Sequence, residues 1–336
     1  MYADISMNSS AQHPYDQLTP DRVLDAIESQ GYLSDARIMA LNSYENRVYQ
    51  VGIEESLRII AKFYRPQRWT KEQILEEHEF SLELHDMEFP IVPPLKNEQG
   101  ETLHEFEGFQ FALFERKGGY PPELDNFDHL LTLGRCMGRL HQLGSAKPFE
   151  HRPAINLQRY GKDNVEWLLE NDFIPTPLLP AYETLSRDIL NKLENIEKQY
   201  QPKAIRVHGD AHCGNILWRD DNAHFVDFDD TCMAPAIQDL WMFLSGDRAN
   251  QTAQLSELLE GYNEFYDFSP IELNLIEYFR TLRLMNYSGW LAKRWQDPAF
   301  PMAFPWFNTE RYWSEHILEL REQMAALDEP PLTIMP

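Results

Sequence analysis

Hydrophobic residues recur at two periods in the first part of the chain. After Thr19 and Pro20, a capping residue and a proline suited to a first turn, they follow helical spacing until Gly31. Short apolar runs separated by polar turns come next, which is typical of strands. The predicted elements of this part are a helix ending at Gly31, three strands within 36–64, a helix over 70–86 and a strand over 109–114.

Adjacent glycine and proline pairs break this pattern at 115–122, and we place a boundary there. Beyond it helical spacing dominates, interrupted by short strand-like runs. The predicted helices cover 128–145, 178–200, 236–246, 251–266, 270–295 and 309–327. The sequence thus predicts an α+β protein with a disordered leader at 1–15, a small β-rich lobe at 16–116 and a larger, mostly α-helical lobe at 117–336.

Size and charge narrow the classes of partner. A chain of 336 residues, 43% of them hydrophobic, can bury more than one core. Acidic residues outnumber basic ones, 54 to 30, and the net charge of -24 repels phosphate backbones and anionic membrane surfaces. We therefore expect no nucleic acid and no membrane as partner. Three scattered cysteines and an N-terminus without signal-peptide features favour the cytoplasm, and we expect a monomer.

The residues suited to catalysis gather in the stretch 206–230, RVHGDAHCGNILWRDDNAHFVDFDD. His208, Asp210 and Asn215 form the pattern His-x-Asp-x4-Asn, in which the aspartate accepts a hydroxyl proton and the amide oxygen binds Mg2+. Asp227 lies in a strand-like apolar run, which would bring a carboxylate to the same metal. Because an acidic chain repels ATP, the predicted co-substrate, the site requires Mg2+. This pattern indicates phosphoryl transfer.

Lys62 lies inside a predicted strand, IIAKF, where an ammonium group requires an anionic partner. Glu77, on the next predicted helix, is the expected partner, with Glu76 as the alternative. Such a pair would hold Lys62 toward the α and β phosphates of a nucleotide. The competing interpretation is that Lys62 extends to solvent and the glutamates form a hydrated helix face.

The turn 42–49 contains no glycine, so it is not a Walker loop. Its small polar groups and backbone amides can still bind phosphate oxygens. Ser43, Asn46 and Arg47 are the predicted nucleotide contacts in this turn. An ordinary hairpin turn stabilised by asparagine is an equal alternative.

We expect several residues near the motif to have structural rather than catalytic roles. We expect His208 to pack or hydrogen-bond within its loop, and Asp239 to accept backbone amide hydrogen bonds from a helix start or from the loop carrying Asp210. His212 and Cys213 lack the spacing of a structural zinc site, so we interpret them as loop and core residues.

At these residues the chain resembles the aminoglycoside and choline phosphotransferase branch of the kinase superfamily, which has HGDxxxxN and a Val-Asp or Ile-Asp pair. Together with LNSYENRVYQV, AKFYRPQRWTKEQILEEHEF, PAIQDLWM and RWQDPAFPMAFPW, the resemblance sharpens to bacterial stress-response serine/threonine protein kinases. It implies a two-lobed protein-kinase-like fold similar to choline kinase, ATP and Mg2+ as requirements, and protein Ser/Thr residues as acceptors, with the kinase itself as a further acceptor.

Carried over by motif, the resemblance implies Asp210 as proton acceptor, Asn215 and Asp227 as magnesium ligands, and Ser43 as an ATP contact. Lys62 and Glu77 occupy the positions of the phosphate-orienting pair, although their match is by position alone. The chain departs from eukaryotic protein kinases because it lacks an Ala-Pro-Glu segment and a Phe-Gly after the metal-binding aspartate. Control by a phosphorylated activation loop is therefore not expected.

Other functions stay open at this point. The motif does not identify the acceptor, so a small-molecule phosphotransferase acting on choline, a sugar or an aminoglycoside is the main alternative. A two-metal phosphohydrolase using His208, Asp210, His212 and Asp227, and a nucleotide-binding pseudokinase, are weaker ones. The aromatic segment from Trp290 to Trp313 is either a wall for the acceptor or core, and core is the more common use of such a run.

Overall fold

The computed structural model describes residues 15–55 and 58–334. The predicted leader at 1–15 therefore lies, except for Tyr15, outside the described residues. The chain divides into two compact units, each built from separate stretches. Unit 1 consists of 1–70, 95–116 and 294–305, and unit 2 of 71–94, 117–293 and 306–336. The division of the chain into two continuous lobes stays a prediction.

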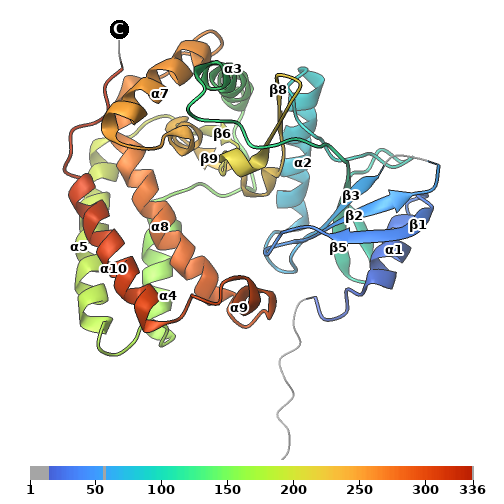
Figure 1. Cartoon of the computed structure of the whole chain (residues 1–336), viewed down its shortest axis with the longest axis horizontal. Coiled ribbons are helices and arrows are strands. Elements are labelled where there is room, and N and C mark those ends of the chain that lie inside the picture. The colour runs from blue at the N-terminus through green and yellow to red at the C-terminus, as the bar shows by residue number, and fades with distance from the viewer. Residues whose placement is uncertain (1–14, 56–57, 335–336) are drawn as a thin grey trace, which may run out of the picture. The chain divides into compact units, whose positions relative to one another are not determined.

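Unit 1 is built on a five-stranded antiparallel sheet with the order β1-β2-β3-β5-β4 (Figure 1). Its strands are β1 Ser34–Ala40, β2 Arg47–Ile53, β3 Ile59–Phe63, β4 His104–Phe106 and β5 Phe109–Glu115. Helix α1, Pro20–Glu28, begins at the predicted Thr19 cap, and its Val23 and Ile27 pack into one core with Phe63 and Phe111. The short helix α9, Ala299–Ala303, also belongs to this unit.

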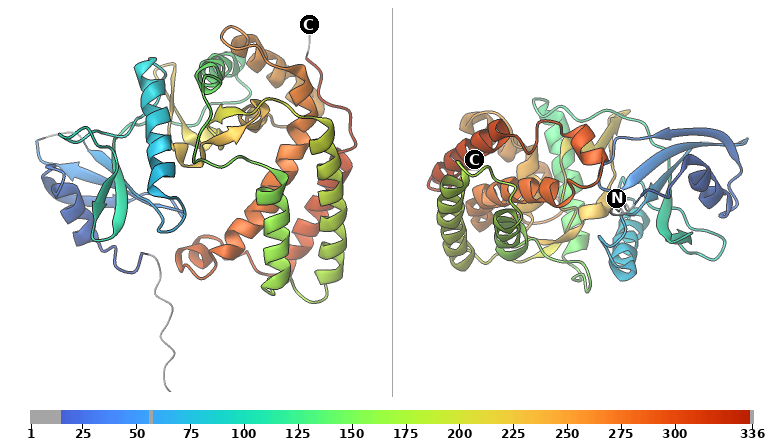
Figure 2. Two further views of the ribbon diagram at one scale, coloured as in Figure 1. Left: turned by 180° about the vertical axis from the view of Figure 1, so that it is seen from behind. Right: turned by 90° about the horizontal axis from the view of Figure 1, so that it is seen from below.

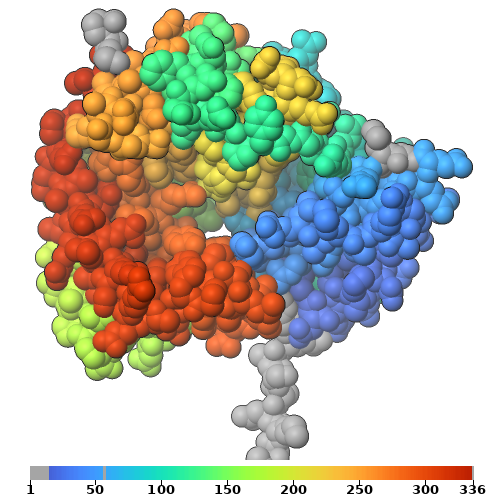
Figure 3. All heavy atoms as spheres, viewed as in Figure 1, coloured from blue at the N-terminus to red at the C-terminus, as the bar shows by residue number. Residues whose placement is uncertain are grey.

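Unit 2 is mostly helical. Its helices are α2 Lys71–Asp86, α3 Phe127–Gly144, α4 Asp163–Glu170, α5 Leu179–Gln199, α6 Ile237–Leu240, α7 Arg248–Tyr262, α8 Ile276–Lys293 and α10 Glu310–Ala326. Helices α5, α8 and α10 lie side by side in both views of Figure 2, and α10 and α7 reach the surface in the space-filling view (Figure 3). In the described part of the chain, no helix combines the length and the apolar character that a membrane crossing requires.

Glycines bring α3 and α7 unusually close together. A Cβ on Gly134 would lie 2.0 Å from the Leu258 carbonyl oxygen, and one on Gly261 would lie 2.2 Å from that of Leu131. Only the absence of a side chain allows backbones to approach this closely. The contact matters for the site because α3 and α7 carry two residues, His141 and Tyr262, that support the catalytic loop.

Most predicted elements are present, with shifted ends, and the predicted sheet-plus-helices architecture is confirmed. The helix predicted over 236–246 is wrong as one element, because α6 ends at Leu240 and Asp247 caps a separate helix. The strand predicted around Asp227 is also wrong: the strand ends at Phe225, and Asp227 has a left-handed backbone with φ of 59°. Strand β4 and helices α4 and α9 were not predicted.

Candidate active site

A short two-stranded ladder positions the loop that carries Asp210. Strands β6, Ile205–Val207, and β9, Cys232–Ala234, pair antiparallel, and the whole motif lies between them. Gly209 follows β6 with φ of +86°, and an added Cβ would lie 2.1 Å from the Asp230 carbonyl oxygen. This glycine is therefore required by both conformation and space.

The carboxylate of Asp239 anchors this loop. It accepts hydrogen bonds from the backbone N–H of His208 and of Gly209, each at 2.8 Å. The ring of His141 lies 3.0 Å from the same carboxylate, and its other nitrogen lies 2.9 Å from the hydroxyl of Tyr262. The predicted scaffold role of Asp239 is confirmed, and a fully buried chain of polar groups extends behind it.

Both ring nitrogens of His208 are used inside the loop. Nε2 donates to the Val226 carbonyl oxygen at 3.1 Å, and Nδ1 accepts from the backbone N–H of Asp210 at 3.4 Å. The ring is fully buried and contacts Phe228 at 4.4 Å between centroids. Its predicted structural role is confirmed, and these contacts leave it unsuited to the metal-ligand role that the phosphohydrolase interpretation requires.

Asn215 connects the two ends of the motif. Its side-chain Nδ2 donates to the Asp210 carbonyl oxygen at 2.9 Å, and its own carbonyl oxygen accepts from the Val226 N–H at 3.0 Å. The intervening hairpin consists of β7, Ile216–Arg219, and β8, Asn222–Phe225. Asp227 comes one residue later, after Val226, so the hydrogen bond of Val226 fixes the backbone position from which the Asp227 carboxylate extends.

The donor set of Asn215 and Asp227 fits Mg2+. Since the Asn215 amide nitrogen is turned toward the loop, the amide oxygen is the atom left to bind a cation. Asp227 supplies a carboxylate, and hard oxygen donors of these two kinds are the ligands that Mg2+ prefers.

Three donors surround the carboxylate of Asp210. Nη1 of Arg283 on α8 lies 2.6 Å from Oδ1, while Nε2 of His212 and Nδ2 of Asn215 lie 3.4 Å and 3.5 Å from Oδ2. Burial raises the pKa of the Asp210 carboxyl, but the His212 hydrogen bond and the Arg283 charge outweigh it and hold that pKa well below its ordinary value. Asp210 is therefore ionised at neutral pH, and sequence reasoning did not identify Arg283.

Glu77 and Glu76 have partners within unit 2 that were not predicted. Glu77 Oε2 accepts from Nη2 of Arg152 at 2.8 Å, and the same guanidinium donates to the Asp229 carbonyl oxygen at 2.6 Å. Glu76 accepts three backbone N–H groups at 150–152, which makes it a structural residue. Arg152 thereby joins α2 to the segment that follows Asp227.

Lys62 is buried in β3 of unit 1, as the hydrophobic pattern predicted. Its strand partners are Val48 and Ala112, and its ammonium lies 5.0 Å from the ring centroid of Tyr64. Because Lys62 and Glu77 belong to different units, the ion pair between them stays a prediction.

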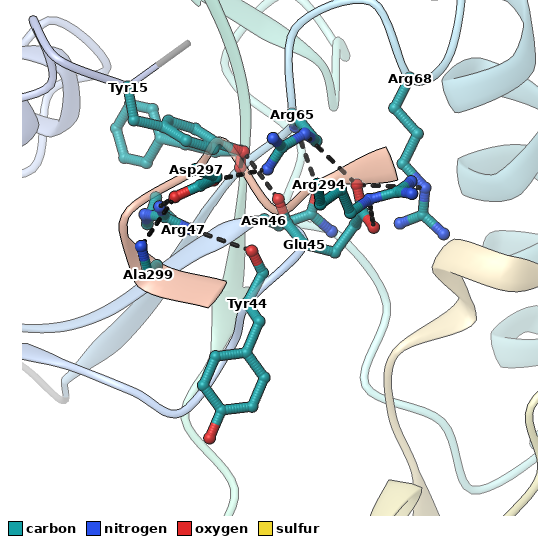
Figure 4. A network of polar contacts seen from close by, with 11 residues as sticks. Tyr15, Tyr44, Glu45, Asn46, Arg47, Arg65, Arg68, Arg294, Asp297 and Ala299 are labelled. Atoms are coloured by element: carbon teal, nitrogen blue, oxygen red, sulfur yellow. Dashed lines mark hydrogen bonds and ion pairs between the residues drawn. The ribbon is translucent and has the colours of Figure 1, made fainter. Parts of the chain in front are cut away.

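The predicted turn at 42–46 connects β1 to β2, and residues 47–49 of the stretch 42–49 already belong to β2. Ser43 is half-buried in the turn, whereas Asn46 is buried and accepts from the backbone N–H of Arg65 at 3.0 Å through Oδ1. Arg47 donates to the Tyr44 carbonyl oxygen at 3.0 Å, across the turn (Figure 4). Asn46 and Arg47 thus stabilise the turn itself, and their contact with nucleotide stays a prediction.

A segment from far along the chain holds this turn. Asp297 lies 3.2 Å from Arg47 and 2.8 Å from Arg65, and Arg294 forms an ion pair with Glu45 at 2.5 Å (Figure 4). Burial lowers the pKa of Arg294, and the charge of Glu45 opposes that shift. The 294–305 stretch, which in the sequence was interpreted as an aromatic run and as part of the family resemblance, therefore positions the predicted phosphate-binding turn.

The aromatic segment from Trp290 to Trp313 divides between core and surface. Trp313 and Phe307 are buried, whereas Trp306 and Met302 are exposed. Part of the segment is therefore core, while Trp290 and Trp295 are half-buried, and its use as an acceptor wall stays a prediction.

The comparison with protein families decides the class. Residues 37–273 match the phosphotransferase enzyme family, which is more than half of the chain. This protein belongs to the phosphotransferase enzyme family. The predicted assignment as an ATP-dependent phosphotransferase is thereby confirmed.

Relatives cover nearly the full length of the chain. Over 330 residues the chain is 44% identical to stress response kinase A of Escherichia coli O157:H7, covering 98% of this chain and 99% of that one. It is 42% identical, with the same coverage, to serine/threonine protein kinase RdoA of Salmonella typhimurium. The resemblance proposed from the sequence motifs is confirmed.

Solved structures show the same fold. An amicoumacin kinase in complex with AMP-PNP superposes with a TM-score of 0.72 at 20% identity, covering 96% of both chains. A choline kinase from Cryptosporidium parvum gives 0.60 at 12% identity, covering 91% and 96%. The predicted kinase-like fold, similar to choline kinase, is confirmed.

Proposed function

We propose that this protein is an ATP- and Mg2+-dependent serine/threonine protein kinase with a role in stress response. The observation that carries the proposal is the loop in which Asp210, Asn215 and the backbone before Asp227 are tied together by hydrogen bonds. The extensive identity with kinases named for serine/threonine and stress response supports the acceptor class.

In the proposed reaction, the oxygen of a protein Ser or Thr hydroxyl attacks the γ-phosphorus of ATP. The bond from that phosphorus to the β–γ bridging oxygen breaks, ADP leaves, and the hydroxyl proton passes to the carboxylate of Asp210. Asn215 and Asp227 would hold Mg2+, which when bound screens the phosphate charge. Lys62, with Glu77, would orient the α and β phosphates, and Ser43 and Asn46 would shape the covering turn. Cytoplasmic location and a monomeric state also stay proposals.

One assay separates the acceptor classes. Purified protein is incubated with γ-labelled ATP and Mg2+, and a generic protein, choline and an aminoglycoside are offered in parallel. We expect label on Ser or Thr of protein only, a loss of transfer when Mg2+ is chelated, and a fall of about 10³-fold or more for Asp210→Asn because the proton acceptor is removed. Label on choline or the aminoglycoside alone would contradict the proposal, and so would full activity of Asp210→Asn.

A further inference from the structure

The carboxylate that would accept the hydroxyl proton is already engaged by a cation. Nη1 of Arg283 lies 2.6 Å from Asp210 Oδ1, and the other oxygen faces the side chains of His212 and Asn215. A hydroxyl can transfer its proton only to an oxygen that it reaches at hydrogen-bond distance. An acceptor hydroxyl that approaches Oδ1 must therefore share this oxygen with Arg283 or displace it, and displacement leaves the oxygen fully open to the hydroxyl.

The environment of Arg283 makes such a movement feasible. Its side chain is 46% exposed, whereas that of Asp210 is 25% exposed, so the guanidinium can exchange the carboxylate for water or another anion while Asp210 keeps its other hydrogen-bond donors. Arg280, one turn earlier on α8, is differently placed, since it pairs with Glu277 at 2.6 Å and lies over the Trp241 ring. Arg283 is thus the α8 arginine that faces the catalytic carboxylate.

The chemistry of the guanidinium group indicates which kind of substrate group can replace Asp210 as the partner of Arg283. Arginine binds carboxylates and phosphates through two parallel hydrogen bonds, and it repels cations. An acceptor that brings an anionic group beside its hydroxyl would draw Arg283 from Asp210 and free Oδ1 in the same step. A cationic acceptor such as choline would instead meet a like charge.

The same face of α8 continues as an aromatic surface. Tyr287 and Trp290 follow Arg283 at helical spacing, and their rings stack at 5.7 Å between centroids. Tyr287 is 40% exposed. A guanidinium followed by two stacked rings along one helix suits an extended peptide, which offers a charged side chain and apolar groups in succession, better than a compact small molecule.

We propose that Arg283 is a specificity-determining residue that recognises a carboxylate side chain next to the acceptor Ser or Thr, and that this recognition uncovers Asp210. The inference rests on the proposed protein kinase function and adds the class of protein substrate, an acidic peptide segment. It also gives the ion pair between Arg283 and Asp210 a role in excluding unsuitable acceptors.

The test uses three peptides that differ only beside a central serine, with glutamate, glutamine or lysine as neighbours, and the full-length protein with ATP and Mg2+. For the wild type we expect kcat/KM to be about tenfold higher for the glutamate peptide than for the glutamine peptide, the range of one charge-assisted hydrogen-bonded contact. Arg283→Ala should bring this ratio close to one, and Arg283→Lys should restore part of it.

Arg311→Ala is the matched control, because it removes one exposed guanidinium elsewhere in unit 2 and should keep the wild-type ratio. A wild-type ratio near one, or the same ratio in Arg283→Ala, would overturn the inference while leaving protein kinase activity established. Transfer to choline but to no peptide would overturn both.

Binding provides a second measurement that does not depend on transfer. A fluorescent glutamate peptide with alanine in place of serine cannot be phosphorylated, so its Kd reports recognition alone. We expect Arg283→Ala to weaken this binding by about tenfold, with thermal unfolding unchanged. Equal affinity of the two proteins for this peptide would overturn the inference even in a preparation without activity.

Discussion

Two loops carry the predicted chemistry, and they are supported in opposite ways. The loop with Asp210 is anchored by backbone N–H groups that donate to one fully buried carboxylate, Asp239. The turn 42–49 is held by several ion pairs that half-buried arginines form with two acids, half-buried Glu45 and buried Asp297. Asp239 fixes backbone atoms next to the reacting groups, whereas around the turn several side chains divide the electrostatic interactions among them.

This difference implies that the two loops respond differently when a supporting carboxylate is removed by substitution. Removing the Asp239 carboxylate leaves buried amides without acceptors, and buried groups without partners are strongly destabilising. Removing one acid from the cluster around the turn leaves arginines that can reach water or the remaining acid. We therefore expect the loss of one acid to destabilise the loop with Asp210 strongly, and to destabilise the turn only moderately.

The largest effect is expected for Asp239→Ala. It should lower the free energy of unfolding by about 4 kcal/mol, because two backbone amides and His141 lose a buried charged partner, and it should abolish transfer. Urea denaturation and the labelled-ATP assay measure the two effects. Asp267→Ala, an exposed aspartate in the same unit, is the control. A fall in the free energy of unfolding of less than about 1 kcal/mol would contradict the anchoring role of Asp239.

A pH dependence would sharpen the comparison, because Glu272 holds the helix that carries Asp239. Its carboxylate accepts from the Ile237 N–H at 2.9 Å at the start of α6. Burial raises the pKa of Glu272 from 4.5 to about 7, although backbone hydrogen bonds oppose the shift. A raised folded-state pKa makes stability greatest below 4.5, and that stability is lost as pH rises to about 7 and above.

Glu272→Gln removes this dependence. Between pH 4.5 and about 7 the stability of the variant should rise relative to wild type, by at most about 3 kcal/mol. Denaturant titrations of both proteins at several pH values provide the measurement. Parallel stability curves across this window would show that Glu272 does not titrate as inferred.

The smallest effect is expected for Asp297→Ala. Two half-buried arginines, Arg47 and Arg65, lose an ion-pair partner, so unfolding should become easier by about 2 kcal/mol. The KM for ATP should rise several-fold with kcat little changed, since the turn loosens while the catalytic loop is intact. Glu98→Ala, an exposed acid in unit 1, should change neither quantity. An unchanged KM in Asp297→Ala would separate this cluster from nucleotide binding.

The two loops also differ in how much of their structure could be predicted from the sequence. Asp210 and Asn215 lie close together in the chain, and their spacing was sufficient to predict that one short loop carries both, whereas the hydrogen bonds of Asn215 and the backbone at Asp227 were not predicted. The loop's partner Asp239 was identified because a short polar residue at the start of an apolar helix is suited to bind backbone amides.

The residues that were missed share one property. Arg283, Arg152 and Asp297 contact the site or the turn from sequence positions far away, and each is a charged residue in a helical or irregular stretch. In a sequence, such residues look the same as solvent-facing charges.

The sequence by itself determined the class of chemistry, the strands and helices with clear periodicity, and the short loop that carries Asp210 and Asn215, because these depend on spacing within about twenty residues. Tertiary structure alone decided that Arg283 faces Asp210, that Arg152 binds Glu77, and that the segment 294–305 returns to the sheet of unit 1. The physical reason is that the partner of a charged side chain is set by proximity in space, and folding brings together groups whose separation along the chain carries no information about their distance.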